Sequence, residues 1–215
     1  MENKIIGYSE RGIMNAILYT IGNDKKKVAE FLTTITGKKV VASDNYKIYI
    51  EHSLSGFGSP DTVIIHNNVV YFIEFKVCAG VKTWSLKKQC EDYKSKKYDA
   101  SNVFYQLYLK KLLFDAEVEG EFVVKDEKAN GKGKDMERKI GSNECVKSLF
   151  DEIKNDKCSG VEYIGIVPKV EKDFGCGEEG FLFCEWSKLL ENYGDCKMVT
   201  DTMKHNNKNN QIYYP

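Results

Sequence analysis

Residues 59–77 read SPDTVIIHNNVVYFIEFKV, and this stretch decides the fold. Two runs rich in β-branched and aromatic residues flank Asn67 and Asn68. Asparagine tolerates the positive φ angles that a tight hairpin turn demands, so the stretch predicts two antiparallel strands joined by this turn. Both runs are almost continuously apolar, which is typical of strands that are covered on both faces of a sheet.

Three charged side chains share one face of this predicted hairpin. With Asn67 and Asn68 as the loop, Asp61 lies directly opposite Glu74, and Lys76 follows on the same face because side chains alternate along a strand. Opposed residues have Cβ atoms roughly 4.5–5.5 Å apart, so the two carboxylates repel each other. A cation between them offsets that repulsion, and oxygen ligands suit Mg²⁺ or Mn²⁺. The alternative is an ordinary hairpin with a solvent-facing aspartate and a Glu–Lys pair.

These residues also resemble a known motif. Pro60-Asp61, a gap that holds one hairpin, and Glu74-Phe75-Lys76 resemble the signature of the PD-(D/E)XK nuclease superfamily. The resemblance covers about residues 7–167. It implies an α/β fold with a central mixed β-sheet, flanking helices and a restriction-endonuclease-like core in the order αβββαβ. It also implies a metal-dependent nuclease that hydrolyses phosphodiester bonds in nucleic acid, with DNA favoured over RNA, and it leaves a homodimer open.

The resemblance assigns roles residue by residue. Asp61 and Glu74 would bind one or two Mg²⁺ or Mn²⁺ ions together with the backbone carbonyl of Phe75, and Lys76 would position or activate water. Many members add an acidic residue from the first helix, and Glu10 is placed for this role. The alternative for Glu10 is that it complements the helix dipole.

A glutamine is expected to assist the site. Some members, RecB-type exonucleases among them, carry a Gln and a Tyr one helical turn apart after the lysine strand. Gln89 and Tyr93 have this spacing and share a helix face. Gln106 is the rival, but its neighbours are apolar and it is equally suited to a hydrogen bond in the core. We take Gln89 as the catalytic glutamine.

Lysines gather directly after the motif. The chain has no net charge, so a nucleic-acid partner must meet a local basic patch. Between residues 82 and 111 lysines outnumber acidic residues, and Lys110 and Lys111 belong to this excess. A phosphate-backbone footprint is expected there, and the alternative is a solvated helix face. The predicted nucleic-acid contacts are Lys82, Lys87, Lys88 and Lys94.

The composition limits the remaining classes. The 215 residues fit one domain spanning 1–215. The seven cysteines are odd in number and lack a C-x-x-C pair, so we expect reduced, buried thiols in a cytoplasmic protein rather than a zinc site or disulfides. No run approaches the roughly 18 apolar residues that span a bilayer, so no membrane partner is expected. The chain lacks a P-loop and a Rossmann glycine pattern, which argues against ATP-driven activity.

Apolar spacing predicts the other elements. Helices are expected at residues 9–22, 25–36, 84–97, 101–116, 142–155 and 187–193, and further strands at 46–52, 163–167 and 180–186. Residues 117–141 are rich in charge and glycine, which indicates a solvated insertion or mobile loop, with a flap over nucleic acid as the alternative. Residues 204–215 are expected to form a flexible tail.

Two further functions stay open at this point. The first is a nuclease-like module without turnover that binds nucleic acid or a protein partner. The second is a structural protein in which the hairpin is only core. The intact set of Asp61, Glu74 and Lys76 favours the nuclease over both.

Overall fold

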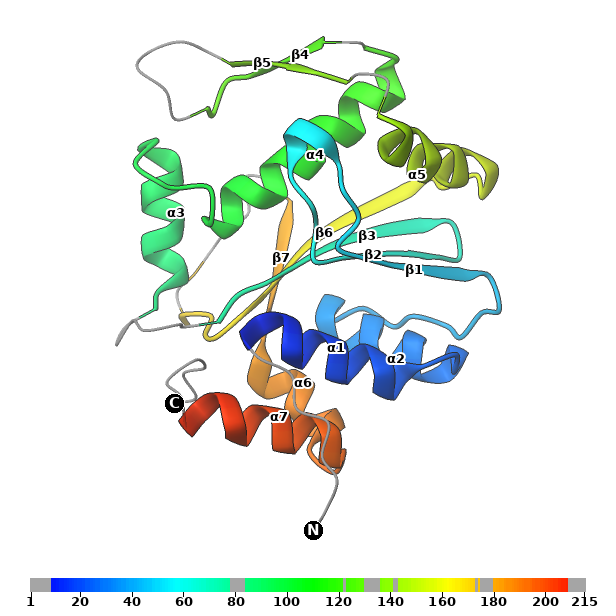
Figure 1. The fold of residues 1–215 in the computed structure, drawn as a ribbon, viewed down its shortest axis with the longest axis vertical. Coiled ribbons are helices and arrows are strands. Elements are labelled where there is room, and N and C mark those ends of the chain that lie inside the picture. Colours follow the sequence, from blue (N-terminus) through cyan, green and yellow to red (C-terminus); the bar gives the residue numbers. More distant parts are fainter. Residues whose placement is uncertain are drawn as a thin grey trace.

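The chain folds around one five-stranded mixed sheet in the order β1-β2-β3-β6-β7 (Figure 1). The computed structural model describes residues 9–77, 84–121, 123–129, 136–140, 143–172, 174 and 180–208. The first three strands form an antiparallel meander, and the last two continue the sheet parallel to β3. The strands are β1 (Tyr46–Ile50), β2 (Thr62–His66), β3 (Val69–Phe75), β6 (Gly160–Val167) and β7 (Phe181–Glu185).

The predicted hairpin is confirmed, with its turn and its register. Asn67 and Asn68 have φ angles of 49° and 69°, as a two-residue turn of this kind requires. His66 pairs with Val69 and Thr62 with Ile73, so the two strands pair in the register that the two-residue turn predicts. Asp61 directly precedes β2, and extending this register by one residue places it opposite Glu74.

Helices cover both faces of the sheet. One face packs against α1 (Ser9–Ile21), α2 (Lys25–Thr36), α6 (Trp186–Tyr193) and α7 (Lys197–Lys208). The other face packs against α3 (Leu86–Lys94), α4 (Val103–Glu119) and α5 (Glu144–Asn155). Alternate residues of the hairpin, such as Phe72 and Ile73, enter the two separate cores. This double burial explains why the strands are apolar at nearly every position, and it confirms the predicted α/β fold class.

The prediction for residues 117–141 is wrong in part. This segment contains a second, two-stranded antiparallel sheet of β4 (Val123–Asp126) and β5 (Met136–Lys139), seen above α4 in Figure 1. A buried polar network holds it: Arg138 Nε lies 2.7 Å from Asp126 Oδ2, and the hydroxyl of Tyr105 donates to the same oxygen at 2.8 Å. The high charge of the segment suggested solvation, but two of its charges pair inside the protein.

Two smaller expectations also need correction. Residues 204–208 belong to α7 rather than to a flexible tail, since Val199 and Met203 earlier in this helix are buried in the core that includes α1; residues 209–215 lie outside the described residues. The cysteines are not uniformly buried, because Cys145 is exposed whereas Cys184 is buried.

Among the described residues, no helix has both the length and the apolar character needed to cross a membrane.

Candidate active site

The predicted motif residues Asp61, Glu74, Phe75 and Lys76 lie at the edge of the sheet where the parallel strands β3 and β6 have their carboxyl ends. Glu74 and Phe75 are the last residues of β3, and the Lys76 N–H continues the ladder by donating to the Ile166 carbonyl of β6 at 2.8 Å. Asp61 comes directly before the antiparallel strand β2 and so lies at the same edge. In open α/β sheets this edge is where ligands bind.

Asp61 is fixed against β3 in an unfavourable electrostatic environment. Its Oδ2 accepts a hydrogen bond of 2.7 Å from the Phe75 N–H. The pKa of Asp61 is raised to about 7, first by burial and then by the negative charge of Glu74. The ammonium of Lys76 and the Phe75 hydrogen bond partly offset this, while Glu10 raises the pKa slightly more. The carboxylates therefore repel each other in the folded protein, as the register predicts.

Glu74 has a buried partner that the sequence did not reveal. Lys110 Nζ of α4 lies 2.9 Å from Glu74 Oε1, and the two side chains are only 1% and 2% exposed. The contact is a buried ion pair, and no other donor to Oε1 is found among the described residues. Glu74 is thus neutralised inside the protein by a cation from α4, and this buried pair is the most notable feature of the site.

The placement of Lys110 corrects the expectation that it belongs to the exposed basic footprint. Val103, Gln106 and Lys110 share one face of α4, because residues three and four apart are neighbours on a helix. A Cβ at Gly165 would meet Val103 at 3.1 Å, so this face lies directly on β6. Gly165 pairs with Glu74 across the parallel ladder, which brings Lys110, two turns further along α4, over the end of β3.

Lys76 is half-buried and is fixed through its backbone. The Trp186 Nε1–H donates a hydrogen bond of 2.7 Å to the Lys76 carbonyl, and the indole packs on Phe75 with ring centroids 5.4 Å apart. Near the Lys76 side chain, the pKa of Asp99 is lowered mainly because Ser101 donates to its carboxylate, and to a smaller extent by the Lys76 charge. Sequence reasoning missed Trp186, which lies beyond the residues that the resemblance covers.

Glu10 lies near the site, at the start of α1. Its charge contributes to the raised pKa of Asp61, which places the two carboxylates close enough to interact. The next residue, Arg11, pairs through Nε with Glu51 at 2.7 Å, and the Glu51 N–H donates to the Asp61 carbonyl at 3.0 Å. The first turn of α1 is thus tied to the segment that carries Asp61.

The two glutamines differ in what they contact. Gln89 is tied to the start of α4: its side-chain oxygen accepts from the Val103 N–H at 3.3 Å, and its carbonyl accepts from the Asn102 amide at 2.8 Å. Gln106 lies one turn from Lys110, and its Oε1 is buried without a hydrogen-bond partner among the described residues. The core hydrogen bond expected of Gln106 is therefore not formed by this oxygen, and the choice of Gln89 as the site glutamine stays a prediction.

The expectation that Tyr93 points at the site with Gln89 is wrong. Tyr93 is 2% exposed and packs in an aromatic cluster against Tyr98, Phe104 and Tyr108, with ring centroids 5.7 to 6.2 Å apart. The spacing of four residues correctly placed Gln89 and Tyr93 on one helix. It did not predict which side of the helix is buried, because the apolar residues of α3 determine that.

Three of the predicted nucleic-acid contacts lie on the surface of α3. Lys87, Lys88 and Lys94 are all exposed, and Lys88 Nζ lies 2.5 Å from Asp92 one turn away. Lys82 lies outside the described residues. The footprint on α3 stays a prediction, although these lysines are accessible to a phosphate backbone.

The donor set fits a divalent cation in part. Among the described residues, no cluster of three or more His, Cys, Asp and Glu side chains is arranged to hold a metal ion. The two carboxylates at the sheet edge still form an oxygen-rich pair, and their repulsion adds to the raised pKa of Asp61. A positive charge between the carboxylates would relieve this repulsion, so the pair suits Mg²⁺ or Mn²⁺ as two of the oxygen ligands of such an ion.

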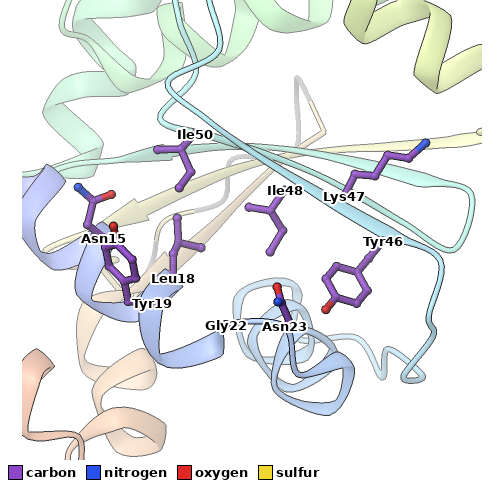
Figure 2. Close-up of a pocket in the computed structure, with 9 residues that line it drawn as sticks. All are labelled: Asn15, Leu18, Tyr19, Gly22, Asn23, Tyr46, Lys47, Ile48 and Ile50. Atoms are coloured by element: carbon purple, nitrogen blue, oxygen red, sulfur yellow. The ribbon is translucent and has the colours of Figure 1, made fainter.

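A cavity of about 470 Å³ lies between α1 and β1 and differs in character from the site at the strand ends. Figure 2 shows Leu18 of α1 on one side of it and Ile48 of β1 on the other. Lys47 points away from it, toward its partners Glu152 and Asp156 on and beside α5. The residues that line this pocket include no carboxylate, so the pocket lacks the acidic oxygen ligands of the site at the carboxyl ends of the strands.

No family model, no curated protein and no solved structure matches this chain.

Proposed function

We propose that this chain is a metal-dependent nuclease of the PD-(D/E)XK type that hydrolyses phosphodiester bonds, with DNA as the favoured substrate. The observation that carries the proposal is the pair Asp61 and Glu74, opposed across the hairpin at the carboxyl end of β3 with Lys76 beside them. The order of helix, antiparallel meander, helix and parallel strand supports it, since it is the order that the resemblance implies.

The residues have distinct roles in this reaction. Asp61 and Glu74, with the carbonyl of Phe75, would hold Mg²⁺ or Mn²⁺, with Glu10 near enough to assist. When bound, such an ion neutralises charge that builds on a phosphate oxygen and acidifies a bound water. Lys76 would donate to the attacking water and favour its deprotonated form. Gln89 would assist at the same water, with Gln106 as its rival for this role.

The surroundings of the site suit a charged substrate. The exposed lysines of α3 would contact the phosphate backbone, and such contacts make binding weaken as salt increases. Trp186 would hold the Lys76 backbone so that the ammonium stays beside the carboxylates.

A second candidate function is a nuclease-like module that binds nucleic acid without cleaving it. One observation favours it: the buried Lys110 ammonium already neutralises Glu74, so the fold contains a cation where the nuclease needs a divalent ion. Such a module would bind DNA or RNA equally well with and without Mg²⁺.

A cleavage assay tests the proposal. Purified protein is incubated with linear, circular and single-stranded DNA and with RNA, in Mg²⁺ or Mn²⁺ or in a chelator, beside Asp61→Ala and Lys76→Ala. The nuclease predicts metal-dependent cleavage that both substitutions abolish. Binding without cleavage of any of these substrates would support the inactive module instead.

A further inference from the structure

Lys110 is an unusual residue to find inside a protein. Lysine is almost never fully buried unless it is paired, and here the side chain is 1% exposed, with Glu74 as its ion-pair partner. Removing both charges from water is expensive, and a buried ion pair is often less stable than a well-packed apolar pair of similar size. Stability alone is therefore a poor reason for a lysine at this position.

The loop that leads to Asp61 is shaped around the Lys110 ammonium. A Cβ at Gly58 would lie 3.3 Å from Lys110 Nζ, and Gly58 has a φ of +79°, a conformation that favours glycine. Lys110 thus lies between the carboxylate of Glu74 and the backbone of the segment that carries the second carboxylate. The ammonium is thus a neighbour of the carboxylate pair that would hold a divalent ion.

We propose that Lys110 is a resident counter-cation: it neutralises Glu74 in the metal-free protein, and Glu74 accepts a divalent ion only against the repulsion of this ammonium. Lys110 therefore keeps the affinity for the ion low. In the metal-free protein it also lowers the cost of burying the Glu74 carboxylate. This inference rests on the proposed function, because it concerns the carboxylates proposed as metal ligands.

The opposite role makes the opposite prediction. If Lys110 only orients Glu74 for coordination, then its loss disorders a ligand and weakens metal binding. If Lys110 is a resident counter-cation, then its loss leaves Glu74 without a neutralising charge and removes a repulsive neighbour of the ion. Both effects then strengthen metal binding, by about tenfold or more, because charges a few ångströms apart in a buried site interact strongly.

Calorimetric titration of the chelator-treated protein with Mn²⁺ distinguishes these roles. Lys110→Gln removes the charge but keeps an N–H donor on a side chain that is one atom shorter. Lys111→Gln is the matched control, because Lys111 is the next residue of α4, is half-exposed and pairs with Asp115 on the surface. We expect Lys110→Gln to bind Mn²⁺ about tenfold more tightly than the wild type, and Lys111→Gln to bind it within about twofold of the wild type.

Each other outcome has a definite meaning. Equal or weaker binding by folded Lys110→Gln overturns the role of Lys110 and leaves the nuclease proposal standing. Binding by the variant alone, with none by the wild type, supports the resident counter-cation in its strongest form. Absence of Mn²⁺ binding in both folded proteins overturns the metal site itself, and with it the proposed function.

A second measurement covers the case in which Lys110→Gln does not fold. In wild-type protein with ¹⁵N-labelled lysine, the buried Lys110 ammonium should give a signal protected from exchange with water. Titration with Mg²⁺ should shift this signal, because the ion displaces or repels the ammonium from Glu74. A protein that binds Mg²⁺ in calorimetry while every protected lysine signal stays unchanged would contradict the inference.

Discussion

Arg138 should be one of the most stabilising charged residues of this chain, because it neutralises an aspartate that water cannot reach. Asp126 is 0% exposed and Arg138 10% exposed, with Nε and Oδ2 2.7 Å apart. Arg138 also donates to the Tyr105 hydroxyl at 2.7 Å and to the Gly56 carbonyl, and it lies 5.8 Å from the centre of the Phe57 ring. The residue therefore ties the β4–β5 hairpin both to α4 and to the loop that leads to Asp61.

The expected effect of Arg138→Met follows from this burial. Removing one partner of a buried ion pair costs about 3–5 kcal/mol, because the other charge stays buried and unpaired. The Tyr105 hydroxyl still donates to Asp126 at 2.8 Å and the Lys128 N–H at 3.1 Å, so we expect the lower part of this range, about 3 kcal/mol. Unfolding in urea, followed by circular dichroism, measures this loss directly.

Two further variants separate the mechanism from a general effect of substitution. Lys139→Met changes the next residue of β5, which is exposed, and should alter the free energy of unfolding by no more than about 0.5 kcal/mol. The double variant Asp126→Asn with Arg138→Met removes both charges and should recover at least about half of the loss, since no unpaired charge remains. A loss below about 1 kcal/mol for Arg138→Met, or no recovery in the double variant, would refute the reasoning.

Two more predictions concern the carboxylate pair and its support. The pKa of Asp61 is raised to about 7 in the folded protein, whereas an aspartate in the unfolded chain loses its proton near pH 4. Between these pH values the folded protein holds a proton that the unfolded chain does not. In metal-free buffer, the free energy of unfolding should therefore fall as pH rises from about 4 to 7. Asp61→Asn should flatten that part of the curve, whereas Asp151→Asn on the exposed side of α5 should not, and parallel curves for wild type and Asp61→Asn would contradict the repulsion inferred here. Trp186→Phe keeps an aromatic ring but leaves the half-buried Lys76 carbonyl without its indole donor. It should destabilise the protein by about 1 kcal/mol in urea and lower the cleavage rate more than it raises KM. Unchanged stability and rate would show that the indole hydrogen bond does not position Lys76.

The hairpin could be predicted from sequence because its information is local. Two asparagines fix the turn, the turn fixes the register, and the register places Asp61 opposite Glu74. The same holds for α2, whose observed bounds match the prediction, since Asp24 caps its first turn and Gly37 ends it in the left-handed conformation. In these segments the turn and cap residues agree with the apolar pattern.

The missed residues act through contacts between segments far apart in the chain. Trp186 donates to a carbonyl 110 residues earlier, and no pattern in either segment points to the other. Lys110 looked like part of a basic surface because charge predicts exposure, but α4 is buried on most sides and leaves it little room for solvent. The β4–β5 sheet was missed because a buried ion pair, rather than an apolar stripe, fixes it against α4.

The measurement that tests the central claim most directly is the initial rate of cleavage of labelled DNA in Mg²⁺ or Mn²⁺ by wild type, Lys76→Ala and Lys87→Ala. Lys76 lies beside the carboxylate pair, whereas Lys87 is an exposed lysine of α3 and serves as the control for lost positive charge. The account predicts metal-dependent cleavage by the wild type, its loss in Lys76→Ala, and a smaller reduction in Lys87→Ala that disappears at saturating DNA. Cleavage that survives in folded Lys76→Ala at the wild-type rate would contradict it.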